Sequence, residues 1–294
     1  MKSFVPGLVA LALMLGGCDA KAAETVSQKQ DTRIALFQTK TIFRSGLKHE
    51  YTIALTFDDG PNPATNEVLD ELKAHNIKAT FFIVGKMASR YPKILARIAA
   101  EGHLLANHSA THPLLGRRFI NNPAKLLAQL RDVNDQIAPL MKQTDKLYFR
   151  APYGYWRSVH AAVLNKDPVL RKYVGPVYWD IGGDTSMTRD GYIMSSADWS
   201  CWKRHWTAQT CAKGYLREIR RKEGGVVLMH AINKKSQALV GAVVPPLLEE
   251  GYRFVRLDQV PEYKQYETPA SSPQVADAGF PLPDDAHAYM RAPK

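Results

Sequence analysis

Apolar runs and helical patterns alternate along the chain between about residues 49 and 261. The run Ala79–Val84 has no regular polar alternation, which is typical of a strand covered on both faces. Strands are predicted at Tyr51–Phe57, Ala79–Val84, His103–Ala106, Leu147–Phe149, Val177–Trp179, Val226–Met229 and Phe254–Leu257.

Helical patterns separate most of these strands. Pro92 and Pro123 stand where a proline suits the first turn of a helix. Helices are predicted at Ala64–His75, at Pro92–Glu101, along an apolar stripe from Leu126 to Leu140, at Lys213–Lys222 and at Gln237–Glu250. Repeated βα units indicate a mainly parallel sheet, and at this length a single α/β barrel.

The first residues have the layout of an export signal. Lys2 precedes an apolar stretch, Phe4–Leu15, that is too short for a comfortable bilayer span. Small residues then precede Cys18, which resembles a bacterial lipobox, so we expect a lipoprotein signal peptide at 1–17 and a lipid on Cys18. A simple cleaved signal and an uncleaved anchor are the alternatives. Asp19 resembles the residue that retains lipoproteins in the inner membrane of some Gram-negative bacteria.

The expected product is therefore an exported, membrane-anchored lipoprotein that faces the periplasm or the cell wall. Residues 18–48 are polar and lack periodicity, which indicates a tether. Residues 262–294 are rich in Pro, Ala, Ser and Asp and are predicted to be a disordered tail. Residues 49–261 remain as one catalytic domain.

The formal net charge of +11 does not indicate a nucleic-acid partner. Lys and Arg are scattered, and the aromatic residues do not interleave with them as stacking platforms would. An anionic membrane or wall polymer is a more economical partner for such a surface. A basic surface that is merely solvated explains the charge equally well.

The chain has three cysteines. If Cys18 carries the lipid, Cys201 and Cys211 remain as a pair that can form a disulfide in an oxidising compartment. Two unpaired thiols in one loop are the alternative. A zinc ribbon is disfavoured because the chain has no Cys-x-x-Cys pair.

Polar residues that could carry chemistry follow several predicted strands, where active sites of such barrels collect. His108 and His112, four residues apart, would lie on one face of a helical turn and could share a metal ion with a carboxylate. Asp58 and Asp59 could supply that ligand and a base, in either order. Carboxylates so close in sequence disfavour a glycosidase, and the histidines disfavour a calcium loop.

Four ordered motifs carry a specific resemblance. Thr56–Gly60, His108–His112, Arg150–Tyr153 and Leu228–His230 resemble those of polysaccharide deacetylases, the NodB-homology group or carbohydrate esterase family four. The resemblance implies a distorted (β/α) barrel of seven or eight units. Zinc, or another divalent transition metal, is the cofactor that it implies.

The resemblance also assigns roles to residues. It implies that Asp59 binds the metal with His108 and His112, while Asp58 is the general base that Arg150 orients and keeps ionised. His230 would protonate the departing amine, and the Tyr153 backbone N–H would help to stabilise the oxyanion. Without the other motifs, Arg150 would be a structural ion pair, Tyr153 a groove aromatic and His230 a strand-end histidine.

One stretch departs from the family pattern. Relatives place a compact Asp-x-x-x-Asp-Trp segment there, whereas this chain has Trp179–Asp184, and Asp198-Trp199 comes only after an insertion. Asp180 and Asp198 are both candidate partners of His230; the Asp-Trp pair favours Asp198. The insertion carries Trp199, Trp202, Trp206 and both later cysteines, and it could stack on sugar rings or pack as a local cap.

The function that follows is a metal-dependent hydrolase that removes N-acetyl groups from an amino-sugar polymer, such as peptidoglycan, chitin-like chains or poly-N-acetylglucosamine. An O-acetyl glycan esterase is a variant of this hypothesis. A catalytically silent, carbohydrate-binding lipoprotein is the alternative class, and the intact motifs argue against it. A non-haem iron oxygenase could also use two histidines and a carboxylate, but βα alternation is not typical of its scaffold.

Overall fold

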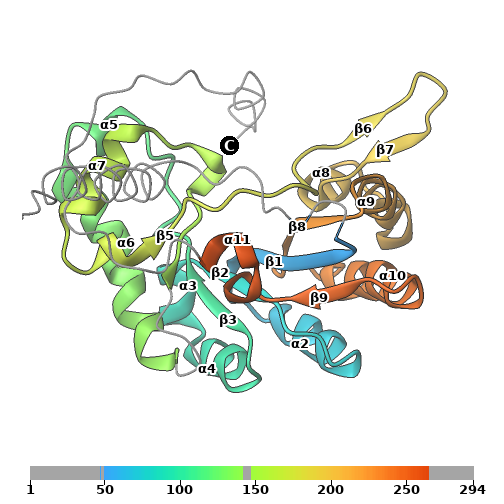
Figure 1. The fold of residues 1–294 in the computed structure, drawn as a ribbon, viewed down its shortest axis with the longest axis horizontal. Helices are drawn as coiled ribbons and strands as arrows, with labels where there is room; N and C mark the ends of the chain where they lie inside the picture. Colours follow the sequence, from blue (N-terminus) through green and yellow to red (C-terminus); the bar gives the residue numbers. More distant parts are fainter. Residues whose placement is uncertain (1–46, 48–49, 142–146, 265–294) are drawn as a thin grey trace, which may run out of the picture.

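A parallel β-sheet forms the centre of the structure (Figure 1). The computed structural model describes residue 47, residues 50–141 and residues 147–264. The sheet contains β1 (Thr52–Gly60), β2 (Thr80–Ile83), β3 (Leu104–Asn107), β8 (Gly224–His230) and β9 (Arg253–Val255). The hydrogen-bonded order is β3, β2, β1 and β8, and β9 pairs with the first residues of β1. The predicted signal peptide, Cys18, Asp19 and nearly all of the tether lie outside the described residues.

Further backbone contacts extend this sheet at both edges. β4 (Leu147–Tyr148) pairs in parallel with β5 (Tyr173–Val174), and a parallel bridge joins Asn107 at the end of β3 to Phe149. The chain after β5 returns to the other edge, where Ile181 pairs in parallel with Val227 of β8. This arrangement is consistent with the predicted distorted barrel, and the α/β class is confirmed.

Apolar side chains from most of these strands pack together in one cluster. This cluster takes buried residues from β1, β2, β3, β4, β5 and β8, namely Ala54, Phe82, Leu104, Ala106, Tyr148, Val174 and Val226. Leu257, Val260 and Tyr263, which follow β9, belong to the same cluster. Leu257 lies in a short 3-10 helix (Leu257–Gln259) and Tyr263 in α11 (Pro261–Lys264), so this packing extends past residue 261. Residues 265–294 of the predicted tail lie outside the described residues.

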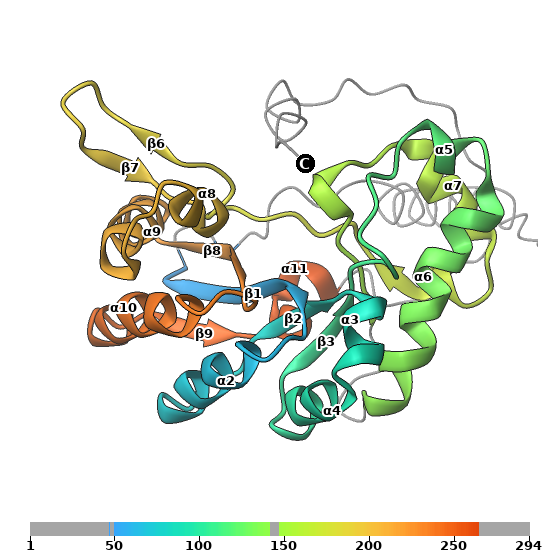
Figure 2. The ribbon, with the colours of Figure 1, turned by 180° about the vertical axis from the view of Figure 1, so that it is seen from behind.

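Helices cover the outside of the sheet (Figures 1 and 2). α2 (Thr65–Ala74), α10 (Ser236–Glu249) and α9 (Ala208–Lys222) lie in a row along one part of it. The other helices are α3 (Gly85–Arg90), α4 (Pro92–Ala100), α5 (Arg117–Ile120), α6 (Pro123–Ile137), α7 (Ser158–Lys166) and α8 (Asp198–Lys203). Among the described residues, none of the helices is both long and apolar enough to cross a bilayer.

The helix α6 shows how the local sequence sets an element. The Asn122 side chain accepts a hydrogen bond from the Lys125 backbone N–H, and Pro123 occupies the first turn. Leu126, Leu130, Val133 and Ile137 recur at helical spacing, and all four are buried. Burial of each such side chain contributes about 1.5–3 kcal/mol.

The predicted strand at Val177–Trp179 is wrong as a regular strand. Val177 N–H donates to the Phe149 carbonyl (2.8 Å), whereas the Asp180 N–H donates to the Val226 carbonyl (2.8 Å). The segment changes hydrogen-bonding partner within a few residues, so no ladder of consecutive pairs forms. It connects the two edges of the sheet instead.

The insertion folds as a hairpin followed by a short helix. β6 (Ser186–Met187) and β7 (Ile193–Ser195) are antiparallel, and the hairpin projects from the body of the molecule (Figure 2). The helix α8 comes next and returns the chain toward the end of β8. The second half of the insertion therefore contacts the central sheet at β8.

Candidate active site

The motif residues converge at the carboxyl ends of the parallel strands. Asp58 and Asp59 end β1, His108 follows β3, Arg150 follows β4 and His230 ends β8. Asp58 and His230 are register partners on neighbouring strands. These ends surround a cavity of about 640 Å³, which Asp58, Asp59, His108, His112, Tyr153 and His230 line together with residues of the insertion.

Three side chains form a cluster suited to a metal ion. Their ligand atoms, one each from Asp59, His108 and His112, all lie within 4.8 Å of one another. Asp59 Oδ1 is 3.1 Å from His112 Nε2 and 3.5 Å from His108 Nε2. His108 Nδ1 lies 2.8 Å from the Arg150 carbonyl, which fixes the proton on Nδ1 and leaves Nε2 free to bind a metal.

A loop, not a helical turn, brings the two histidines together. Ser109 has φ of 69° and His112 has φ of 52°, values outside the helical region. The Asn107 side chain accepts a hydrogen bond from Ser109 N–H (2.9 Å), and Ser109 Oγ accepts one from His112 N–H (3.1 Å). Strand-end side chains thus impose this turn, and the predicted helical geometry at His108–His112 is wrong.

The electrostatics of the trio fit a cation. Asp59 Oδ1 is buried and accepts no hydrogen bond from any described residue. Burial alone would raise the pKa of Asp59, but the contact with His108 and the charges that His230, His112 and His108 carry when protonated hold this pKa well below its usual range. Burial lowers the pKa of His112 to about 4, helped by His108, so His112 is neutral at pH 7. Two imidazoles and one carboxylate suit a divalent transition metal.

Asp58 is held by a buried arginine. Arg150 Nη1 donates to Asp58 Oδ1 (2.7 Å) and to Thr56 Oγ1 (2.9 Å), and its Nε donates to the Val177 carbonyl (3.0 Å). The guanidinium lies 4.0 Å from the centre of the Phe82 ring. Arg150 is 1% exposed. A buried, hydrogen-bonded cation thus fixes one Asp58 oxygen, while Asp58 Oδ2 lies 3.5 Å from His108 Nε2.

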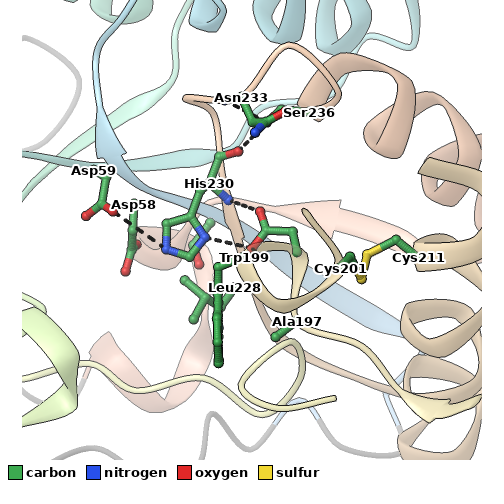
Figure 3. A network of polar contacts seen from close by, with 12 residues as sticks. Asp58, Asp59, Ala197, Trp199, Cys201, Cys211, Leu228, His230, Asn233 and Ser236 are labelled. Atoms are coloured by element: carbon green, nitrogen blue, oxygen red, sulfur yellow. Dashed lines mark hydrogen bonds and ion pairs between the residues drawn. A yellow bond between two sulfur atoms is a disulfide. The ribbon is translucent and has the colours of Figure 1, made fainter. Parts of the chain in front are cut away.

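His230 is held by Asp198. Figure 3 shows the His230 ring between Asp59 and the segment that carries Trp199. Asp198 Oδ1 lies 2.7 Å from His230 Nδ1, and Asp198 Oδ2 accepts a hydrogen bond from the His230 backbone N–H (2.6 Å). Burial lowers the pKa of His230, but the charge and hydrogen bond of Asp198, with smaller effects of Asp59 and Asp58, raise it to about 10. His230 Nε2 is 3.8 Å from Asp59 Oδ2. A protonated imidazole thus faces the trio.

Asp180, the other candidate partner of His230, is wrong in that role. Its Oδ2 accepts a hydrogen bond from the Val226 backbone N–H (2.8 Å). Val226 lies four residues before His230 on β8, which is about 13 Å at the rise of a strand. Asp180 therefore holds the connecting segment against β8.

The tryptophans of the insertion have two different roles. Trp199 is 40% exposed and lines the cavity, whereas Trp202 and Trp206 pack against the buried core. The predicted disulfide is present and joins Cys201 of α8 to Cys211 of α9. Sequence reasoning missed Asp184, Thr185, Ser200, Lys203 and Arg204, which also line the cavity. Their closeness to Asp198 along the chain was the only available signal.

Tyr153 also lines the cavity. Its ring centre is 4.6 Å from that of His112, and its backbone has φ of 57°. Its backbone N–H donates to no acceptor in the part of the chain that the structure describes. The donor therefore remains available to a ligand.

Comparison with known proteins gives consistent matches. The polysaccharide deacetylase family profile matches residues 46–169. Over 218 residues the chain is 30% identical to peptidoglycan-N-acetylmuramic acid deacetylase PdaC of Bacillus subtilis (strain 168). This alignment covers 74% of this chain and 40% of that protein. Over 240 residues the chain is 41% identical to a chitooligosaccharide deacetylase of Sinorhizobium fredii (strain NBRC 101917 / NGR234). This alignment covers 75% of this chain and 96% of the relative.

Solved structures include similar folds. The family 4 acetyl xylan esterase from Clostridium thermocellum, in complex with a cobalt ion, superposes with a TM-score of 0.55 and 25% sequence identity. The match covers 71% of this chain and 89% of that one. The chain thus spans nearly the whole of one curated relative and less than half of another.

Proposed function

The chain belongs to the polysaccharide deacetylase family, and we propose from this membership that it is a metal-dependent hydrolase that removes N-acetyl groups from an amino-sugar polysaccharide or oligosaccharide. One observation carries the proposal. A carboxylate and a protonated histidine, Asp58 and His230, flank the trio of Asp59, His108 and His112 in one cavity.

Each residue has a chemical task in this reaction. Zinc held by Asp59, His108 and His112 would supply Lewis-acid polarisation of the acetyl carbonyl and of the attacking water. Asp58 takes the proton of that water, and Arg150 fixes its carboxylate in the orientation to do so. His230 donates a proton to the departing amine, which is a poor leaving group without it. The Tyr153 backbone N–H stabilises the developing oxyanion.

Amino-sugar polymers of the cell envelope are the proposed substrates. The named relatives act on peptidoglycan and chitooligosaccharides. We propose that the protein is exported and anchored by a lipid on Cys18, as the apolar stretch Phe4–Leu15 and the small residues before Cys18 favour. An oxidising compartment would also preserve the Cys201–Cys211 disulfide.

A substrate panel tests the function. Acetate release should be measured on peptidoglycan, chito-oligosaccharides, poly-N-acetylglucosamine and acetylxylan, with zinc added. We expect release from at least one N-acetylated glycan. Release from acetylxylan alone would assign an O-acetyl esterase, and no release from any of the four would overturn the enzyme proposal.

Asp198→Asn should change the pH dependence of kcat. A general acid works in its protonated form, so the rate falls as pH rises through its pKa. Without the Asp198 charge, burial lowers the pKa of His230, and the high-pH limb of kcat should move from near 10 toward the ordinary histidine value of 6.5. The measurement is kcat between about pH 6 and 10.5.

Asp184→Asn is the matched control for this pH shift. Asp184 lines the same cavity, and its side chain accepts a hydrogen bond from Thr185 N–H (2.7 Å). This variant loses a cavity charge without losing the His230 contact. If both variants show the same limb as the unchanged protein, Asp198 does not set the protonation of His230.

Trp199→Ala should weaken substrate binding. An exposed indole beside the cavity offers a stacking surface for a sugar ring, and its loss should cost about 1–2 kcal/mol, a rise in KM of about fivefold to thirtyfold. Tyr192→Ala is the control, since Tyr192 is 51% exposed on the β6–β7 hairpin, outside the cavity lining. Equal KM changes in both variants would contradict a stacking role.

A further inference from the structure

One face of α9 contacts the segment that carries Asp198. Cys211, Gly214 and Tyr215 follow each other at the i, i+3 and i+4 positions of a helix, and all three are buried. Each attaches to a different point of the chain between β7 and the end of α8. The three contacts together fix where α8 begins.

Tyr215 makes the most direct attachment. Its hydroxyl accepts a hydrogen bond from the Asp198 backbone N–H (3.0 Å) and donates one to the Leu228 carbonyl (3.0 Å). Asp198 holds the His230 ring, and Leu228 lies two residues before His230 on β8. One hydroxyl, fully buried, therefore ties the residue that orients His230 to the strand that carries it.

The other two contacts fix the same segment. A Cβ on Gly214 would lie 2.6 Å from the Ser195 carbonyl carbon, so α9 packs directly on the backbone just before Asp198. The Cys201–Cys211 disulfide ties α8 to α9 three residues after Asp198. α8 has only six residues, too few to be a stable helix alone. Its position depends on α9.

We propose that Tyr215 and the Cys201–Cys211 disulfide are positioning groups for His230. The inference rests on the proposed function of His230 as the proton donor. Asp198 bonds both the backbone N–H and the ring of His230, so a displacement of α8 moves the ring. The metal-binding trio sits on separate segments, at the ends of β1 and β3. A loss of positioning should therefore affect proton donation and leave metal binding intact.

Tyr215→Phe tests the first attachment, because it removes the hydroxyl and keeps the ring. We expect kcat on an N-acetylated oligosaccharide to fall about tenfold to a hundredfold, as a displacement of a catalytic group by about 1 Å would cause. KM and zinc content should stay within about twofold of the unchanged protein. Tyr263→Phe is the matched control, since it removes the hydroxyl of another fully buried tyrosine, on α11.

Two comparisons separate positioning from general damage. On 4-nitrophenyl acetate, whose phenolate departs without a proton, Tyr215→Phe should lose less than about threefold. In a His230→Ala background, Tyr215→Phe should add less than about a twofold loss on the oligosaccharide, because both act on one step. The positioning proposal is overturned if Tyr215→Phe lowers kcat by the same factor with and without His230, or if it lowers the rate on 4-nitrophenyl acetate as much as the rate on the oligosaccharide.

The disulfide is tested by the double variant Cys201→Ala/Cys211→Ala, because thiol reductants would compete for zinc. We expect kcat to fall in the same way as in Tyr215→Phe. The ¹H–¹⁵N signal of His230 Nδ1–H reports the Asp198 contact without any substrate and should weaken in both variants. An unchanged signal and kcat in the double variant would remove the disulfide from the proposal.

The same signal distinguishes the two proposals. If the unchanged protein releases acetate from no glycan, yet Tyr215→Phe loses the His230 signal, the proposed function fails and the positioning inference stands. If acetate is released and the signal is unaffected by Tyr215→Phe, the function stands and the positioning inference fails.

Discussion

Replacing Asp58 by Asn is expected to lower kcat for acetate release by about a hundredfold to ten-thousandfold, the usual contribution of a general base. The amide keeps the size of the side chain but cannot take a proton from water. The zinc trio is untouched, so zinc content should remain at the level of the unchanged protein. Acetate release under saturating substrate, with zinc measured on the same sample, checks the result.

Asp58→Asn also removes the negative charge beside Arg150, which should lower stability. The control variant must therefore lose a similar buried charge away from the active site. Arg150 is 1% exposed and would lose its partner, which typically costs about 3–5 kcal/mol of stability. Asp167→Asn removes another buried carboxylate bonded to an arginine, with Asp167 Oδ2 2.9 Å from Arg131 Nε. That control should lose stability and keep kcat. If Asp58→Asn is folded and retains more than about a tenth of kcat, Asp58 is not the base.

Loss of a zinc ligand should have the second large effect. His112→Ala removes one of three ligand atoms, and we expect zinc affinity to fall by more than about a hundredfold, beyond the loss typical of outer-sphere partners. Acetate release should disappear at micromolar zinc. The His112 side chain is 22% exposed, so the change leaves no buried cavity and the fold should persist. Calorimetric zinc titration measures the affinity.

Chelation is the companion experiment for the metal. Dialysis against a chelator should abolish acetate release, and zinc should restore it in the unchanged protein. His75→Ala is the control for His112→Ala, because it removes a half-buried histidine that pairs with Glu71 of α2, outside the metal-binding trio. Full activity after verified removal of metal would contradict a metal-dependent reaction.

The strand-end motifs were predictable because parallel strands bring their carboxyl ends together. Asp58, Asp59, His108, Arg150 and His230 each follow a short apolar run, so a local pattern was enough to place them near one another. The roles of these residues came from the resemblance of the four motifs to the family. This is why the candidate site could be assembled before the fold was known.

Features that depend on particular side-chain hydrogen bonds were not predictable in this way. The turn at His108–His112 follows from side-chain bonds of Asn107 and Ser109, which overrule the helical spacing. The choice between Asp180 and Asp198 depended on where the insertion returns to β8. Tyr215 is one residue on a helix face, and only the fold shows that its hydroxyl meets Asp198.

The pairing of β1 with strands from the end of the chain limits how the protein can be made. Thr52 of β1 pairs with Gly224 of β8 and with Arg253 of β9, so closing these contacts orders almost the whole domain at once. A nascent chain that ends before β8 exposes one apolar edge of β1, which favours aggregation. The sheet around β1 can therefore close only once β8 and β9 have been made, and chains shortened within the last forty or so described residues should accumulate as insoluble protein.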